Sequence, residues 1–237
     1  MKILGLLLLL AVAACSSAAP YSTTVGSLAP GRTMEVRVAS TTLSAFAPAV
    51  GEPSNRFTVS ATAMAKGTPP PAPTVRPNRT GIVVDAPDRL ADLLVRVPSG
   101  VTLVVHSQSG DVRVTNIPGP ANLFAGNGNV QAIVPGYASA STVTGNLGIT
   151  VGGTSWPGTL VFRSGRGDVV VWVNEQAKFR VRMHTDDGTL FTDFDLRGTS
   201  SGASETIDGA VNGGSAQRID VETRAGTVRL LRLHPEA

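Results

Sequence analysis

The sequence predicts an all-β protein whose main part is a β-solenoid, a single-stranded β-helix of short strands joined by Gly-Asp and Gly-Asn turns. Three observations predict this fold. A glycine followed by a small polar residue and an alternating apolar strand recurs about every 20 residues. The chain holds 26 Gly and 16 Pro, which favour turns between short strands. Beyond the N-terminus, no window has the apolar spacing of an amphipathic helix.

The N-terminus, MKILGLLLLLAVAAC, has the features of a secretory signal peptide. Lys2 supplies the positive charge, residues 3–12 form the apolar region, and Ala14 is a small residue suited to cleavage before Cys15. The apolar run is too short for a membrane-spanning helix. We therefore expect residues 1–14 to be a signal peptide that is removed between Ala14 and Cys15.

Cys15 is the only cysteine of the chain, and VAAC resembles the lipobox of bacterial lipoproteins. That resemblance implies that Cys15 becomes the first mature residue and receives a diacylglyceryl group, often with a third acyl chain such as palmitate. Two or more chains give stable membrane anchoring. Ser16, in place of an aspartate, favours the outer membrane or cell surface by the same resemblance. The alternative is an ordinary secretory signal followed by an incidental cysteine.

Residues 15–30 are small and polar after Cys15, which predicts a lipidated cysteine and a flexible tether. Residues 31–80 form an N-terminal β segment, with strand-like pieces TMEVRV and RFTVSATAM. Within it, the proline-rich stretch Gly67 to Pro77 is predicted to be a stiff loop, because proline has no N–H to donate to a sheet. Residues 81–237 form the predicted repeat domain.

The repeat domain alternates apolar and polar residues after each turn. In FRVRM, for example, Phe179, Val181 and Met183 share one face, so each strand is half-buried and needs a second layer. Stacking coil upon coil supplies that layer, and glycine permits the positive-φ corner. A β-sandwich of hairpins is the alternative that such alternation permits. The predicted structural turn residues are Gly110, Asp111, Gly128, Gly145, Gly167, Asp168, Gly188 and Gly226, with Gly209 as a weaker member.

The run from Val95 to Val114, VRVPSGVTLVVHSQSGDVRV, resembles the opening of the bacterial DUF4097 family, whose members are often labelled adhesins. The resemblance extends over about Leu90 to Leu233. It implies a β-solenoid fold, a location in the cell envelope and, in several lineages, a link to envelope-stress regulation. It implies no catalytic residues. The proline-rich stretch and residues 51–55 depart from the family pattern as insertions.

Charge and composition give little support for nucleic-acid binding. The formal net charge is +3, and it falls to +2 when Lys2 leaves with the signal peptide. Basic residues are scattered between apolar ones, and aromatic residues are only 5% of the chain. The sequence therefore lacks both a basic tract and a stacking platform.

Arg166-Gly167-Asp168 is the tripeptide that many adhesion ligands present to integrins. Two interpretations are open. Gly167 aligns with the other turn glycines, and Asp168 aligns with Asp111 and with Asn residues at the same position of other repeats. Because a short polar residue suits a turn before a strand, we favour a structural corner over integrin recognition.

Clustered aspartates raise the hypothesis of a β-helix polysaccharide lyase or hydrolase, which would use calcium. The candidates are Asp186, Asp187, Asp193 and Asp195, with Asp208 from a nearby coil. We place the first two at a turn and the next two on one face of a strand. The alternative, a solvated polar face, is favoured because calcium-binding repeats are absent. We predict no metal, no cofactor and no catalytic residues.

Other reactive or aromatic side chains do not form a recognisable constellation. His106, His184 and His234 are not at metal-ligand spacing. Gly198 to Gly202, GTSSG, imitates a nucleophile elbow without its strand-to-helix context, so we predict a loop. Trp172 and Trp156 either stack on sugar rings or fill the core and a corner.

These observations predict a lipid-anchored, extracytoplasmic bacterial protein with an adhesin-like binding or structural role at the cell envelope. The expected partners are the membrane, through the lipid anchor, and an envelope polysaccharide or protein. An envelope-stress regulatory module that binds a membrane partner is one alternative. A polysaccharide-active β-helix enzyme is the other.

Overall fold

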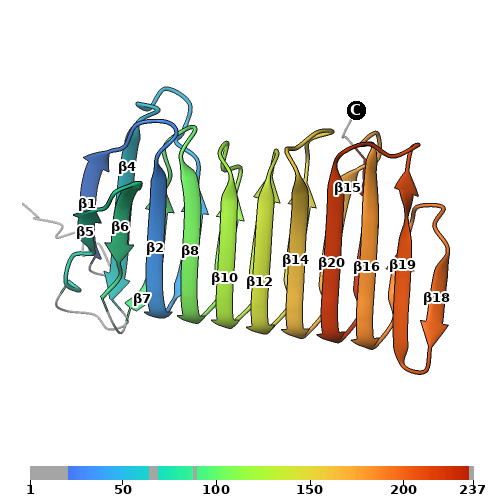
Figure 1. The fold of residues 1–237 in the computed structure, drawn as a ribbon. Helices are drawn as coiled ribbons and strands as arrows, with labels where there is room; N and C mark the ends of the chain where they lie inside the picture. The colour runs from blue at the N-terminus through green and yellow to red at the C-terminus, as the bar shows by residue number, and fades with distance from the viewer. Residues whose placement is uncertain (1–20, 64–68, 88–89, 235–237) are drawn as a thin grey trace, which may run out of the picture.

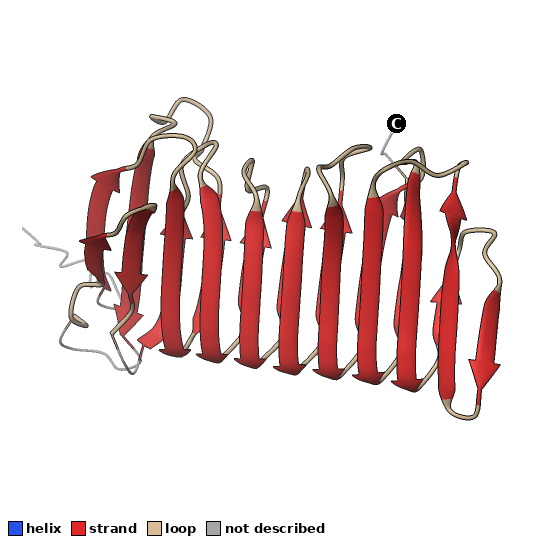
Figure 2. Cartoon of the chain, viewed as in Figure 1, coloured by secondary structure: helices blue, strands red, loops and turns tan. Residues whose placement is uncertain are grey.

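The computed structural model describes residues 21–63, 69–87 and 90–234. Within these residues the chain forms 21 strands and no helix, so no helix is available there to cross a bilayer (Figures 1 and 2). The strands form two facing sheets of ten and eleven strands, and the prediction of an all-β solenoid is confirmed.

The ten-stranded sheet contains, in spatial order, β1 (Tyr21–Ser27), β4 (Arg56–Ala63), β7 (Leu90–Arg96), β3 (Thr42–Phe46), β9 (Val112–Thr115), β11 (Val130–Val134), β13 (Leu147–Val151), β15 (Val169–Asn174), β21 (Val228–Leu233) and β17 (Leu190–Thr192). The eleven-stranded sheet contains β18 (Gly198–Ser201), β19 (Ser204–Val211), β16 (Phe179–Asp187), β20 (Arg218–Ala225), β14 (Thr159–Arg166), β12 (Ala138–Thr144), β10 (Ala121–Asn127), β8 (Thr102–Ser109), β2 (Thr33–Ser40), β6 (Gly81–Asp85) and β5 (Thr74–Pro77).

The repeating unit is a coil of two strands joined by a short turn. A longer strand in the eleven-stranded sheet runs into the turn, and a shorter strand returns in the ten-stranded sheet. Equivalent strands of neighbouring coils pair in parallel and in register, as Leu123 with Ala140 and Val130 with Leu147. This register places equivalent side chains next to one another along the stack.

The order of coils in space departs from their order in the chain at both ends. From β8 to β15 each coil stacks on the one before it. The last coil, β20–β21, then lies between β14–β15 and β16–β17 (Figure 1). At the other end, β2–β3 lies between β6–β7 and β8–β9. Strand β2 thus belongs to the same stack as the repeats, with no break in the core at residue 80.

Antiparallel strands extend both sheets at the N-terminal end of this parallel stack and the eleven-stranded sheet at its C-terminal end. Strands β4 and β1 follow β7, and β5 pairs with β6, at the N-terminal end. Strands β19 and β18 follow β16 at the C-terminal end. An exposed edge of a parallel stack offers unpaired backbone groups to other chains, and these strands occupy three of the four sheet edges, with β17 at the fourth.

The prediction of a flexible tether through Pro30 is wrong for residues 21–27, which form β1. This strand pairs with β4 along its whole length, Tyr21 opposite Thr62 and Ser27 opposite Arg56. Its small polar residues suit an edge strand with little burial, since the backbone hydrogen bonds supply the pairing. Cys15 and the rest of residues 1–20 lie outside the described residues.

Three local predictions also need correction. Thr74 to Pro77 is an edge strand, where the missing proline N–H faces no partner strand. GTSSG is not a loop, because its first four residues form β18 in a hairpin with β19. Gly209 is not a turn glycine: it lies within β19 opposite Val181, and a Cβ there would meet the side chain of Leu196.

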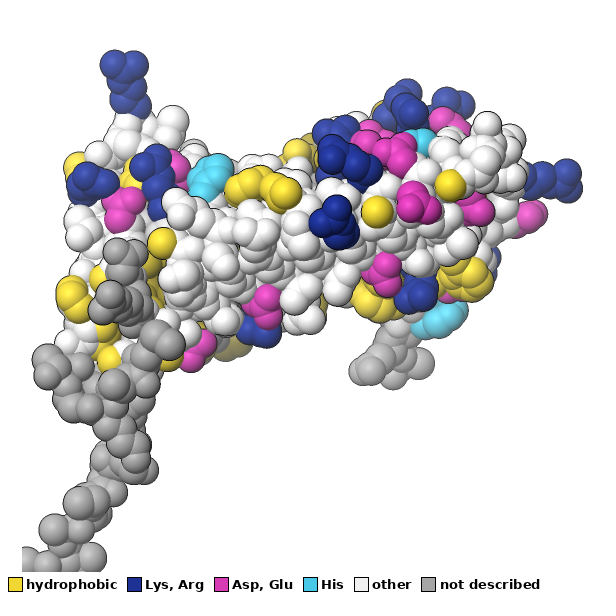
Figure 3. Space-filling view, turned by 90° about the horizontal axis from the view of Figure 1, so that it is seen from below, with side chains coloured by type: hydrophobic (Ala, Val, Ile, Leu, Met, Phe, Trp, Pro, Cys, Tyr) yellow, Lys and Arg dark blue, Asp and Glu magenta, His cyan; other side chains and the backbone are white. Residues whose placement is uncertain are grey.

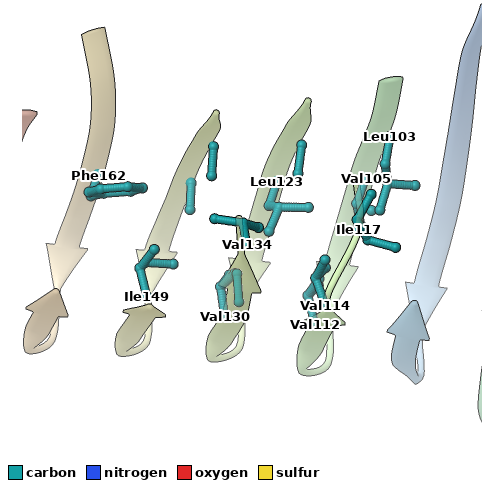
Figure 4. Packing of buried hydrophobic residues seen from close by; sticks show 14 of the residues in the cluster. Leu103, Val105, Val112, Val114, Ile117, Leu123, Val130, Val134, Ile149 and Phe162 are labelled. Atoms are coloured by element: carbon teal, nitrogen blue, oxygen red, sulfur yellow. The ribbon is translucent and has the colours of Figure 1, made fainter. Parts of the chain in front are cut away.

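Aliphatic side chains from both sheets fill the space between them (Figure 4). The predicted strand faces are confirmed, since Phe179, Val181 and Met183 are buried and the arginines between them are exposed. In places a large residue neighbours a small one along the stack. Phe162, for example, is in register with Ala140, whose small side chain leaves room for the ring.

Candidate functional site

The six turn glycines lie one above another and form what we call the glycine column: Gly110, Gly128, Gly145, Gly167, Gly226 and Gly188, in spatial order. Their φ angles are positive, from 115° to 159°. A Cβ on Gly145 would lie 2.0 Å from the carbonyl oxygen of Gly128, and one on Gly167 would lie 2.1 Å from that of Gly145. The column therefore needs glycine for the close approach of neighbouring backbones as well as for φ.

The residue after each turn glycine forms a second ladder at the same corner. The Asp168 N–H donates to Oδ1 of Asn146 at 2.8 Å, and the Thr227 N–H donates to Oδ1 of Asp168 at 2.9 Å. Asp111 and Asn129 act in the same way on the N–H groups of the next coils, Asn129 and Asn146. These side chains thus satisfy N–H groups at the corner between the two sheets.

Arg166-Gly167-Asp168 lies at this corner. Gly167 belongs to the glycine column, and the carboxylate of Asp168 accepts the Thr227 N–H. Only Arg166 is exposed. The arrangement fits a repeated structural corner and leaves the Asp168 carboxylate engaged within the fold.

A row of buried hydroxyl groups beneath the corner was missed from the sequence. The hydroxyl of Thr142 donates to the carbonyl of Gly128 at 3.0 Å, and that of Ser164 donates to the carbonyl of Gly145 at 2.9 Å. Each lies three residues before its own turn glycine. The signal is present in five of the six repeats, where this hydroxyl row comprises Ser107, Thr142, Ser164, Thr223 and Thr185, and Ala125 occupies the sixth.

The aspartates of the polysaccharide-lyase hypothesis do not form a metal site. Asp186 and Asp187 end strand β16 and are not at a turn. Asp193 and Asp195 follow β17 and are not on a strand, and Asp193 accepts the backbone N–H of Arg232. No group of three or more His, Cys, Asp or Glu side chains within the described residues is placed to hold a metal ion.

The histidines and tryptophans are separate from one another. His184 contacts Thr206 and Asp186, and His234 contacts Glu175. His106 on β8 lies 3.9 Å from Glu35 on β2, toward the N-terminal end of the eleven-stranded sheet and away from His184. On the same face, the pKa of Arg37 is raised by its hydrogen bond to Glu35 and by the charge of that carboxylate.

Trp156 fills a corner of the core, and Trp172 lies on an outer face. The Trp156 indole N–H donates to the carbonyl of Arg218 at 3.2 Å, and its ring packs 5.7 Å from that of Phe179. Trp172 is half-buried on the ten-stranded sheet, beside Gly148. The two rings therefore do not form a common platform for a sugar.

A depression of about 300 Å³ lies on the outer face of the eleven-stranded sheet, near its C-terminal end. Strands β14, β20, β16 and β19 meet there. Arg218 on β20 is in register with Arg180 on β16. Two residues further along the same strands, Asp220 is in register with Arg182, and Arg182 is in turn opposite Asp208 on β19. We call this the arginine depression, with the lining side chains Thr159, Arg180, Arg182, Asp208, Arg218 and Asp220.

Charge is unevenly distributed along the outer surface. In the view of Figure 3, charged side chains gather toward both ends of one edge, and the middle of the molecule is largely uncharged. Arg163 pairs with Glu222 at 3.2 Å and with Asp220 at 3.7 Å. Among the described residues, no carboxylate lies within 4.0 Å of the guanidinium groups of Arg180, Arg182 or Arg218.

The fold and the surface together define a β-solenoid with two strands per coil, capped at both ends. A family model described as Toastrack DUF4097 matches residues 99–231, which is more than half of the chain. The protein belongs to this family. No curated protein matches the chain.

Several solved structures are similar to this chain. One is described as a "putative cell adhesion protein" from Clostridium sporogenes, with 9% identity and a TM-score of 0.48, covering 90% of this chain and 100% of that one. Another is a "putative adhesin" from Bacteroides fragilis, with 7% identity and a TM-score of 0.34, covering 91% and 98%. A "putative adhesin" from Parabacteroides merdae has 9% identity and a TM-score of 0.29, covering 89% and 96%.

Proposed function

We propose that this protein is a lipid-anchored, extracytoplasmic binding protein of a bacterial envelope, with an adhesin-like role. The observation that carries the proposal is the single cysteine, Cys15, at the end of a signal-like segment and six residues before the first strand. Membership of the Toastrack DUF4097 family supports it.

The position of β1 bears on how the anchored molecule would be presented. Tyr21 begins the outermost strand of the ten-stranded sheet at the N-terminal end of the stack. Six residues of extended chain from Cys15 to Tyr21 reach at most about 20 Å. A lipidated Cys15 would therefore hold this end close to the bilayer and leave the C-terminal end, with the arginine depression, as the end that can face outward.

The binding role rests on the rigidity of the stack. Continuous parallel pairing from β8 to β15 holds the outward side chains in fixed rows. Preorganised rows lose little conformational entropy when a ligand binds. The proposed partner is an envelope polysaccharide or protein that meets these rows, while the lipid chains keep the protein at the membrane.

The lipid anchor is tested by Cys15→Ser in the full chain, with Ser16→Ala as the matched control that keeps the cysteine. The wild type and the control are expected in the membrane fraction, and Cys15→Ser in the soluble extracytoplasmic fraction or unprocessed. Metabolic labelling with a fatty acid should mark the wild type and Ser16→Ala, which keep Cys15, and should not mark Cys15→Ser. A Cys15→Ser protein that stays membrane-bound and labelled would refute the anchor.

The binding role is tested by co-sedimentation of the full chain with peptidoglycan, purified surface polysaccharide and lipid vesicles. Saturable binding to one of the two polysaccharide fractions is expected. If neither fraction binds and cross-linking in the intact cell captures no protein at the outer faces of the sheets, the adhesin-like role is wrong.

A further inference from the structure

We propose that the arginine depression binds a carboxylated sugar unit, such as a uronate, of an envelope or surface polysaccharide. This inference rests on the proposed binding function and names the ligand class and the site. It starts from an imbalance of charge on the outer face of the eleven-stranded sheet.

Arg180 and Arg218 are neighbours on adjacent parallel strands, in register and on the same outward face. Neighbouring strands are about 4.8 Å apart, so the two guanidinium groups compete for the same region. Like charges placed side by side on a sheet are destabilising unless a counter-charge lies between them. Among the described residues, no carboxylate lies within 4.0 Å of either group, so the fold leaves this position open to an external anion.

The same face shows that the sheet can neutralise an arginine. Arg163, on the next strand, contacts two carboxylates, Glu222 and Asp220. Arg218, on the adjacent strand β20, and Arg180, one strand further on, have no such partner among the described residues. Guanidinium forks bind a carboxylate through paired hydrogen bonds, which makes a carboxylate the fitting ligand group.

The rest of the lining favours a sugar over a phosphate-rich ligand. Asp208 and Asp220 line the depression together with the arginines. Their carboxylates accept hydrogen bonds from hydroxyl groups, but they repel a ligand unit that brings more than one negative charge into the depression, as a phosphate monoester does. The Thr159 hydroxyl adds a further polar contact. A singly charged, hydroxyl-rich unit satisfies both kinds of side chain.

A polymer can also continue from the depression along the face. The row that contains Asp220 goes on through Val161, Ser139 and Asn122 on the next three strands. These side chains are small or uncharged, so they place no charge in the path of a neighbouring sugar. The depression itself, at about 300 Å³, lies at the lower end of the range for small-ligand sites.

The test measures binding of the full chain, in detergent, to polygalacturonate and to neutral dextran. The wild type is expected to bind polygalacturonate saturably and dextran at least about tenfold more weakly. Arg180→Gln/Arg218→Gln should weaken polygalacturonate binding by about tenfold or more, because two charge-assisted contacts are removed. The matched control is Arg166→Gln/Arg229→Gln, which lowers the net charge equally and should change binding by less than about twofold.

Thermal unfolding separates a binding role from a structural one. Arg180→Gln/Arg218→Gln relieves a repulsion, so its melting temperature should equal or exceed that of the wild type. A melting temperature several degrees lower would show that the two arginines support the fold, and it would overturn the inference. Equal binding by this variant and the wild type would overturn it as well.

Two further outcomes identify what has failed. If inorganic phosphate displaces polygalacturonate to the same extent as galacturonate at the same concentration, or to a greater extent, the site does not select a carboxylated sugar and the inference is wrong. If the wild type binds an envelope fraction but not polygalacturonate, this inference fails and the proposed function stands. If it binds no envelope fraction or protein partner, both fail.

Discussion

The middle of the stack and its capped ends are held together in different ways. In the middle, the tightest glycine contacts are with backbone, as Gly145 meets the carbonyl of Gly128. In the capping strands β1, β18 and β19, they are with side chains: Gly26 meets the ring of Phe57, Gly198 meets Ile207, and Gly209 meets Leu196. In the middle, the close contacts between neighbouring coils are therefore made by backbone atoms. In the capping strands, they are made by individual side chains.

This difference explains why only the middle repeats in sequence. A backbone contact is the same in every coil, so every coil needs the same residue at that position. A contact with a particular side chain occurs once, and it leaves no periodic signal. Function can vary most where the repeat places no demand, which is on the outward faces and at the caps.

Gly145→Ala separates the two regions most sharply. Its Cβ would meet a backbone carbonyl that is held by the next coil, so we expect the free energy of unfolding to fall by about 3 kcal/mol or more. Urea-induced unfolding measures this loss. Gly136→Ala is the control, because nothing lies within 4 Å of its Cβ, and it should change stability by less than about 1 kcal/mol. Equal stability of the two variants would contradict the backbone fit.

Gly26→Ala tests the side-chain fit at the N-terminal cap. The added Cβ lies 2.4 Å from the Phe57 ring. Because Gly26 is on the edge strand β1, which can move outward, we expect a smaller loss of about 1–2 kcal/mol. A double-mutant cycle with Phe57→Leu measures the coupling. The cost of Gly26→Ala should largely disappear once the ring is gone, and an unchanged cost would show that the contact is not with Phe57.

Thr142→Val probes the hydroxyl row in the middle. Valine keeps the shape of threonine but leaves the carbonyl of Gly128 without its buried donor, so a loss of about 1–2 kcal/mol is expected in urea unfolding. Thr150→Val is the control on the outer face of the ten-stranded sheet and should be close to neutral. A neutral Thr142→Val would mean that this hydroxyl row does not stabilise the corner.

Asn146→Ala should have the smallest effect. It removes the acceptor for the Asp168 N–H. Because this N–H can donate to water instead at the exposed corner, we expect the free energy of unfolding to fall by only about 0.5–1 kcal/mol. Hydrogen exchange of the Asp168 amide should become faster, while Asn122→Ala, on the outer face of β10, should leave it unchanged. Unaltered exchange in Asn146→Ala would show that the side-chain ladder does not protect the corner.

Much of the repeat was predictable because its signals are local. Alternation placed Phe179, Val181 and Met183 on the inner face, and the recurring glycines marked the corners. The buried hydroxyls also recur in the sequence, three residues before the glycines, but a polar side chain does not mark an inward position in an apolar pattern. The strand β1 was missed because a short polar edge strand has the same composition as a tether.

The candidate site was less accessible from the sequence. Arg180 and Arg218 are 38 positions apart in the chain, and they become neighbours only because β20 lies beside β16. The aspartates that the sequence grouped, Asp186 to Asp195, are divided between a strand end and the residues after β17. Proximity in the chain was thus a poor guide to proximity on the surface.

The sequence by itself determined the class of fold, the inward and outward faces of the strands, and the glycine corners. These follow from the period of two in a strand and from the space that a Cβ needs, and both act over a few residues. Only the tertiary structure decided the order of the coils at the two ends, the antiparallel caps and the charged neighbours of the arginine depression. Those features depend on which strand fills the open edge of a sheet, and that choice joins residues far apart in the chain.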